Sequence, residues 1–273
     1  MFVSRGRLWL CAVPLVLAAT VVPAAGQYRG QPSNVATGET YTIEIGAALW
    51  NPTPTFVISS EQFGIGGTEI DFVEDLGVAK KRLPELRVVL RPGRKHKLRL
   101  QYFRGSYDAD GILRRTVVFN GIQYDVGLPV QSALDWHTVR FGYEYDFLYR
   151  DRGFVGLLLE GRYTRVRAEL ESPVNSEFSE ANAPIPAVGA IARFYVLPNI
   201  SITGEATGFR LPEDEDRDWN GRYFDYDIYG TVNITDRVGA QFGYRSLDVS
   251  YDIDQDFGDL ELRGVYLAGV VRF

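Results

Sequence analysis

Gly264-Val-Tyr-Leu-Ala-Gly-Val-Val-Arg-Phe273, the C-terminal stretch of the chain, decides the fold because its residues alternate in character with a period of two. Counting back from Phe273, every second residue is apolar or small, namely Val271, Gly269, Leu267 and Val265. The other row contains Arg272 and Tyr266. Successive side chains of a β-strand point to opposite faces, so this alternation predicts a strand with two chemically different faces.

Nine segments upstream alternate in the same way, so the sequence predicts ten strands between residues 40 and 273. Their apolar rows span residues 41–49, 86–90, 98–102, 139–147, 155–163, 188–196, 200–206, 224–234 and 238–244. Three other stretches, 56–60, 67–75 and 115–127, could lengthen strands or add a hairpin, which leaves between eight and twelve strands open. The predicted fold class is all-β, as a closed antiparallel up-and-down barrel.

The connections between these strands alternate between short and long. Tight turns are expected at residues 91–95, 149–153, 197–199 and 235–237, and longer or polar loops at 51–82, 106–133, 171–184, 211–220 and 252–259. Both ends of the predicted barrel lie on the side of the short turns. Loops sorted in this way are typical of a transmembrane barrel, whereas a soluble sandwich gives no reason for the sorting.

The row opposite to the apolar row carries many charges, which are expected to face the barrel interior. Eight are acids and seven are bases, so the interior can neutralise itself through ion pairs. Because a ten-stranded cylinder is narrow, long side chains can meet across it, and we expect a largely plugged lumen. The fifteen residues are Glu44, Glu85, Arg87, Lys97, Arg99, Arg140, Glu144, Asp146, Glu160, Arg162, Arg193, Glu205, Asp225, Asp227 and Arg245.

The first 26 residues are typical of a secretory signal peptide, with a basic start at Arg5 and Arg7, an apolar run and small residues at the end. Residues 27–39 lack periodicity and are expected to be a flexible leader, followed by the barrel at 40–273. The single cysteine, Cys11, lies in the signal segment, so disulfides and cysteine-ligated metals are excluded from the mature chain. The formal net charge of −6 argues against nucleic acid as a partner.

Segments 83–93 (LPELRVVLRPG), 139–147 (VRFGYEYDF) and 238–245 (VGAQFGYR), with the closing VVRF, resemble the small bacterial outer-membrane β-barrel proteins, the outer membrane protein β-barrel domain family. This resemblance implies a Gram-negative outer membrane, a monomer, and contact with outer-membrane lipid and lipopolysaccharide. It also implies insertion by the barrel-assembly machinery, with Phe273 as the assembly signal. The family shares no reaction, so neither catalysis nor a cofactor is expected.

Candidate chemistry is sparse. His137, with Asp135 two residues before it, is similar to half of the site of omptin-type surface proteases, for which Asp108/Asp110 or Asp225/Asp227 could supply a second acidic pair. However, His137 shares its row with the apolar Val139, which favours the lipid face. The acidic loops 212–218 and 252–259 do not match a calcium loop, so no metal site is expected.

The sequence therefore indicates a barrel with a structural or surface-interaction role. The alternative is a narrow diffusion channel for small solutes, and an omptin-like protease is a weaker alternative.

Overall fold

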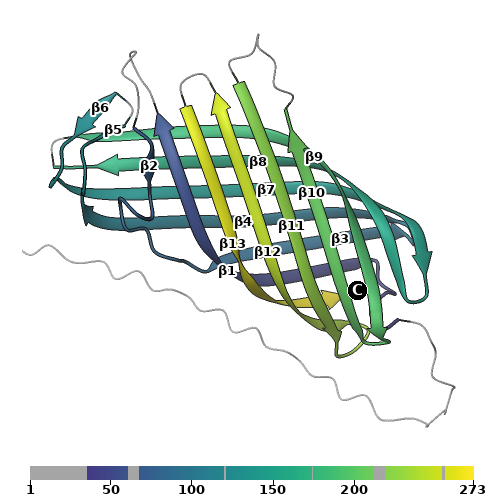
Figure 1. The fold of residues 1–273 in the computed structure, drawn as a ribbon. Coiled ribbons are helices and arrows are strands. Elements are labelled where there is room, and N and C mark those ends of the chain that lie inside the picture. The colour runs from purple at the N-terminus through teal and green to yellow at the C-terminus, as the bar shows by residue number, and fades with distance from the viewer. Residues whose placement is uncertain (1–35, 61–67, 120, 174, 212–218, 254–255) are drawn as a thin grey trace, which may run out of the picture. The chain divides into compact units, whose positions relative to one another are not determined.

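Ten antiparallel strands close into a barrel in the computed structural model of the protein, which confirms the predicted fold class (Figure 1). The structure describes residues 36–60, 68–119, 121–173, 175–211, 219–253 and 256–273. The barrel strands are β1 (Ile43–Ser60), β3 (Leu83–Gly93), β4 (His96–Ile112), β7 (Pro129–Arg150), β8 (Gly153–Glu171), β9 (Ser176–Leu197), β10 (Ile200–Arg210), β11 (Trp219–Asn233), β12 (Val238–Ile253) and β13 (Asp256–Arg272). No helix within these ranges is long and apolar enough to cross a membrane.

The barrel closes where the C-terminal strand meets the first strand. β13 pairs with β1 along its whole length, from Glu44 opposite Arg272 to Ser60 opposite Asp256. The backbone of Phe273 continues this ladder, since its N–H donates to the Ile43 carbonyl at 2.8 Å. The Phe273 side chain is 68% exposed on the outer surface. The alternating C-terminal segment thus forms the closing seam.

A belt of exposed apolar side chains surrounds the barrel beside the short turns. Most belong to the rows predicted to face lipid; Leu159, for example, is 60% exposed. A continuous apolar surface of this extent is unfavourable in water and indicates a membrane. Its members include Ile43, Ile45, Leu49, Leu86, Leu90, Leu100, Val139, Phe141, Leu157, Leu159, Val188, Phe194, Ile202, Phe224, Ile228, Val232, Phe242, Val265, Leu267 and Val271.

The strands continue beyond this belt, and there their polarity reverses. On β8 the outward row is apolar at Val155, Leu157 and Leu159, but becomes charged at residues 165–171. The inward row changes the opposite way, from Glu160 and Arg162 to the buried Val166, Ala168 and Leu170. The same exchange occurs on β1, β7, β12 and β13. Each reversal marks where a strand leaves the apolar belt and enters water.

The projecting part of the barrel therefore holds an apolar core, which the sequence reasoning did not anticipate. The predicted bounds of several long loops are wrong, because β1, β4, β7 and β9 extend into them. Stretch 56–60 does lengthen β1, as one of the open alternatives proposed. The core includes Trp50, Phe56, Ile58, Phe103, Leu134, Trp136, Val166, Leu170, Leu247, Val249, Leu260 and Leu262.

Prolines mark two places where the wall of the projecting part divides. Pairing of β1 with β3 ends at Trp50 opposite Leu83, and pairing of β9 with β10 ends at Val188 opposite Gly208. Beyond these points β1 and β9 each pair with one long strand, β13 and β8. Proline has no N–H to donate and is confined to strand edges. Just beyond these points, toward the projecting end, lie Pro52 and Pro54 of β1 and Pro184 and Pro186 of β9.

Short elements cover the division between β1 and β4. β2 (Ile70–Asp71) pairs with β1, and β5 (Val117–Phe119) pairs with β6 (Ile122–Tyr124) as a hairpin. The buried side chains Val117, Phe119 and Tyr124 attach this hairpin to the apolar core. Arg115 joins the hairpin to the β2 segment through an ion pair with Asp75 at 2.7 Å. Its hydrogen bond lowers the pKa of the Asp75 carboxyl below its usual value.

Candidate functional site: the sealed lumen

A continuous chain of ion pairs fills the interior inside the apolar belt. It alternates strictly between acid and base through thirteen residues, so that every base has an acid on both sides. In order, these residues are Asp146, Lys97, Glu144, Arg99, Glu205, Arg140, Glu160, Arg162, Asp225, Arg245, Glu85, Arg87 and Asp227. We call this set the ion chain.

The ion chain crosses the lumen as well as following the wall. Arg99 of β4 reaches Glu205 of β10 at 2.6 Å, although these strands are not neighbours in the sheet. Arg162 of β8 reaches Asp225 of β11 at 2.9 Å. Arg245 of β12 contacts Glu85 of β3. These contacts connect strands that are not neighbours in the sheet, so they close the lumen and constrain the cross-section of the barrel.

The contribution of such a network to the stability of the fold depends on its burial. The ion-chain side chains are at most 17% exposed, and most are below 5%. Removing charges from water costs about as much as their attraction returns, so the intact network is a weak source of net stability. Removing one partner, however, leaves an uncompensated buried charge and costs about 3–5 kcal/mol. The network is therefore best understood as a determinant of one specific closed arrangement.

The short-turn end of the lumen is closed by residues 36–39. The Thr37 N–H donates to the Pro198 carbonyl at 2.7 Å, and the Gly38 N–H donates to Asp236 at 3.1 Å. Glu39 then accepts hydrogen bonds from Arg193 at 2.9 Å and from the Tyr195 hydroxyl at 2.7 Å. These contacts join the segment to the β9–β10 turn, to the β11–β12 turn and to β9.

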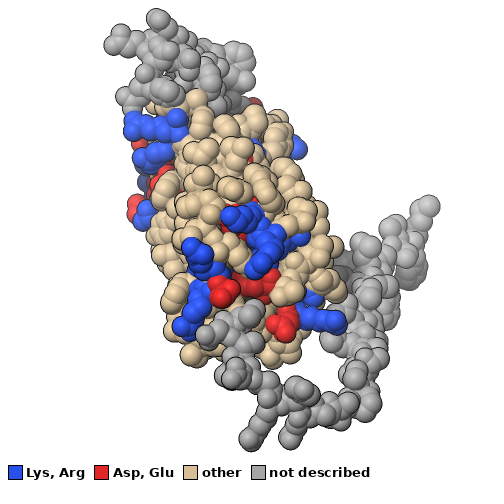
Figure 2. Space-filling model, turned by 90° about the vertical axis from the view of Figure 1, so that its right-hand side faces the viewer, with Lys and Arg blue, Asp and Glu red and all other residues tan. Residues whose placement is uncertain are grey.

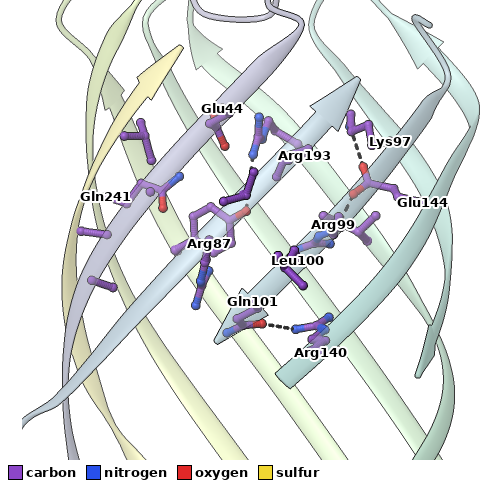
Figure 3. Close-up of a pocket in the computed structure, with 18 of the residues that line it drawn as sticks. Glu44, Arg87, Lys97, Arg99, Leu100, Gln101, Arg140, Glu144, Arg193 and Gln241 are labelled. Carbon is purple, nitrogen blue, oxygen red and sulfur yellow. Dashed lines mark hydrogen bonds and ion pairs between the residues drawn. The ribbon is translucent and has the colours of Figure 1, made fainter. Parts of the chain in front are cut away.

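A small cavity lies beside the ion chain, and its lining includes Tyr41, Lys97 and Arg193. It measures about 40 Å³, which is room for a few water molecules. Figure 3 shows Arg87, Arg99, Arg140 and Glu144 directed into it, with Lys97 bonded to Glu144 and Gln101 to Arg140. Beyond the ion chain, the apolar core fills the projecting part. The lumen is thus occupied at three successive levels.

All fifteen charged residues expected in the interior lie on the inner row, and thirteen of them form the ion chain. The other two belong to separate contacts, since Arg193 binds Glu39, and Glu44 binds Arg272 across the closing seam at 2.5 Å. Sequence reasoning missed Glu39, which it assigned to the leader. It also missed tyrosines that donate to ion-chain acids, as Tyr266 does to Asp227 at 2.9 Å. Position on the inner row is the signal that identifies Tyr266.

The residues considered for a protease site are not brought together. His137 lies on the outer face of β7, where it lines an external groove with Asp135. Asp225 and Asp227 lie inside the wall and are bound by arginines. Asp108 and Asp110 are exposed on the outer face of β4, and Asp108 pairs with Lys81 at 3.2 Å.

No cluster of three or more metal-ligating side chains occurs in the described part of the chain. Loop 212–218 lies outside the described residues, as do positions 254 and 255 of the other acidic loop.

Comparison with known proteins identifies the fold. No family model matches the sequence, and no curated protein matches it significantly. Among solved structures, the outer membrane protease OmpT from Escherichia coli aligns with a TM-score of 0.58 at 9% identity, covering 88% of this chain and 99% of that one. An outer membrane channel from Pseudomonas putida F1 aligns at 0.40 with 11% identity, covering 89% and 99%, and Ail of Yersinia pestis at 0.36 with 10%, covering 83% and 98%.

At such identities the comparison establishes the architecture and carries no reaction to this chain. The closed ten-stranded barrel, its exposed apolar belt and its sorted loops are together those of an integral β-barrel protein of the outer membrane.

Proposed function

We propose that the protein is a non-conducting outer-membrane barrel with a structural or surface-interaction role. The observation that carries this proposal is the ion chain, which joins opposite walls across the lumen between two other closed levels. A diffusion channel needs a continuous aqueous path, whereas the lumen retains a cavity of about 40 Å³. The projecting strands and the β5–β6 hairpin then form the surface available to the exterior.

Planar-bilayer conductance of the mature chain tests this proposal. We expect no steps above the background of the detergent, with a general porin in the same bilayers as the positive control. Stable ion-selective steps would overturn the sealed lumen and favour the narrow diffusion channel. A second preparation that lacks residues 27–39 should also fail to conduct, because the ion chain and the apolar core remain in place.

Lipopolysaccharide is the partner that best suits the outside of the wall. An external groove contains Tyr102 and Tyr163 beside Arg165 and Arg167, so aromatic rings lie next to cationic groups at the upper edge of the apolar belt. Arg104 is a further cation on the neighbouring strand β4, opposite His137. Phosphate groups of the outer leaflet would lie at this depth. We also infer that the barrel-assembly machinery inserts the chain as a monomer and reads the exposed Phe273.

A protease role has less support, because His137 and the inner acids Asp225 and Asp227 lie on opposite sides of the wall. Asp108 and Asp110 share the outer face with His137, but they lie opposite Ala133 and Gln131, farther along β7. Cleavage of dibasic peptides by the wild type and by His137→Ala tests it. We expect no His137-dependent cleavage. Activity that is lost in His137→Ala would revive the enzyme interpretation.

A further inference from the structure

Two neighbouring turns carry four exposed cations at the short-turn end of the barrel, which faces the periplasm in outer-membrane barrels. Arg94 and Lys95 lie in the β3–β4 turn, and Arg150 and Arg152 lie in or beside the β7–β8 turn. We propose that this basic corner binds the headgroups of acidic phospholipids in the inner leaflet of the outer membrane. The proposal is independent of whether the lumen conducts.

The fold holds the two turns side by side. β4 pairs with β7, with His96 opposite Tyr145, and the Asp146 N–H donates to the Lys95 carbonyl at 2.8 Å. Figure 2 views the molecule from the side on which the short turns lie, and shows Lys and Arg side chains gathered there. The four cations therefore form one patch from two adjacent hairpins.

The patch differs from the interior because its cations lack acidic partners. None of the four forms an ion pair with any residue that the structure describes, whereas every base of the ion chain has two. Asp151, in the β7–β8 turn itself, is the acid between Arg150 and Arg152 in the chain. Glu39 lies in the cleft beneath Arg94 and Arg150, but Arg91 and Arg193 already bind it. The corner thus retains a net positive charge toward solvent.

Aromatic side chains place this corner at the membrane surface. Tyr143, Tyr145 and Phe147 are 38%, 37% and 50% exposed along β7, on the side of the turn. Tyr149 continues toward the turn, and the Arg94 guanidinium lies 5.4 Å from the centre of its ring. Tyrosines of barrel proteins gather at the headgroup level, so cations just beyond them lie among lipid phosphates.

Depth also decides between two anionic partners. The cations lie on tight turns directly after the aromatic residues, so they lie within the range over which charges near a surface interact with headgroups. The anionic cell-wall polymer would meet a projecting domain more readily than this flush rim. Acidic phospholipid is therefore the partner that we assign, and binding of the polymer is an outcome of the test.

The experiment measures lipid selectivity of the full mature chain in vesicles of phosphatidylcholine that contain a minority of phosphatidylglycerol. Spin-labelled phosphatidylglycerol and spin-labelled phosphatidylcholine report the relative association of each lipid with the protein. We expect a preference of about fivefold for phosphatidylglycerol at low salt, which decreases as salt rises. In the triple variant Arg94→Gln, Lys95→Gln, Arg150→Gln the preference should fall close to one. Arg152 is kept, because it donates to the Val196 carbonyl.

A matched control removes three exposed cations that already have acidic partners. These are Lys81, which pairs with Asp108, Arg222, which pairs with Asp248, and Arg263, which pairs with Glu261. The control variant Lys81→Gln, Arg222→Gln, Arg263→Gln should keep most of the preference. Heat-dependent gel mobility confirms that both variants are folded.

The proposal is overturned if the wild type shows no preference, or if the two triple variants lose it equally. A different result would assign the corner to the cell-wall polymer. In that case the wild type in detergent binds the isolated polymer in a salt-sensitive way and shows no lipid selectivity, and the triple variant Arg94→Gln, Lys95→Gln, Arg150→Gln does not bind the polymer.

Discussion

Arg99 of β4 and Glu205 of β10 meet across the lumen, with 2.6 Å between the guanidinium Nη2 and the carboxylate Oε2. Their strands are separated in the sheet by β7, β8 and β9, so the contact connects opposite sides of the wall. Glu205 also accepts from Arg140 of β7 at 3.3 Å. One carboxylate thus joins three strands, which explains how a short acidic side chain contributes to closing the lumen.

Removal of this carboxylate should be costly, and removal of the pair should be less so. Glu205→Leu leaves Arg99 and Arg140 buried with fewer acidic partners, and we expect a loss of about 3–5 kcal/mol in the free energy of unfolding. The double variant Arg99→Met, Glu205→Leu restores charge balance and should recover part of that loss. Urea unfolding in detergent, analysed as a double-mutant cycle, measures both. The cycle is completed by the single variant Arg99→Met, and a loss in the double variant equal to the sum of the two single losses would contradict coupling across the lumen.

The reversal of polarity along β8 predicts losses of stability that differ in size at two outward positions. Leu159→Arg places a charge in the apolar belt and should cost about 2–4 kcal/mol of stability in a bilayer. Glu171→Arg changes charge on the same outward row beyond the belt and should alter stability by less than about 0.5 kcal/mol. Unfolding in lipid vesicles compares the two. A large loss from Glu171→Arg would show that the membrane extends farther along the strand.

Much of the architecture could be predicted from the sequence, because each strand carries two rows of different chemistry. The inner charges were also predictable, since the period-two alternation of each strand alone assigns Arg99, Glu205 and Asp225 to the inner row. This alternation does not predict which acid forms an ion pair with which base, because the ion pairs depend on the tilt of strands that are far apart in the chain. Contacts of Glu39 could not be predicted, since its segment lacks periodicity.

The apolar core was missed for a different reason. Leu134 and Trp136 lie on the predicted strand that follows loop 106–133, but the prediction considered only the charged residues of its inner row. The apolar residues of that row are the signal that indicates the core. The prolines at 184 and 186 carried a further signal, because they mark an edge within a strand that otherwise alternates regularly.

The ion pair of Asp75 with Arg115 gives the outer cap, formed by the β2 segment and the β5–β6 hairpin, a dependence on pH. A hydrogen bond from Arg115 lowers the pKa of Asp75 below its usual 3.8, so the pair stabilises the folded state above that value. Stabilisation should be lost as the pH falls from the usual value of 3.8 through the lowered pKa. The contribution is modest, at most about 1 kcal/mol, because Arg115 is partly exposed. Amide hydrogen exchange of residues 71–77 measures it.

Arg115→Gln provides the control for this effect. In the variant the pKa of Asp75 should return toward its usual value, and protection of the segment should be lower already at neutral pH. Unchanged exchange in the variant would mean that the ion pair does not hold the cap.

The most direct test of a sealed barrel in a membrane is a scan of single spin-labelled cysteines along β8. The mature chain offers a clean background, because its only cysteine, Cys11, lies in the predicted signal segment. Labels are placed from residue 154 to residue 171, omitting Glu160 and Arg162 of the ion chain, in vesicles that contain molecular oxygen or a water-soluble nickel complex.

We predict that oxygen reaches alternate residues from 155 to 163, and that the nickel complex reaches alternate residues from 165 to 171. The inward positions should be protected from both reagents. Access of the nickel complex to inward positions between 154 and 164 would reveal an open aqueous lumen, and loss of the alternation would contradict the barrel itself.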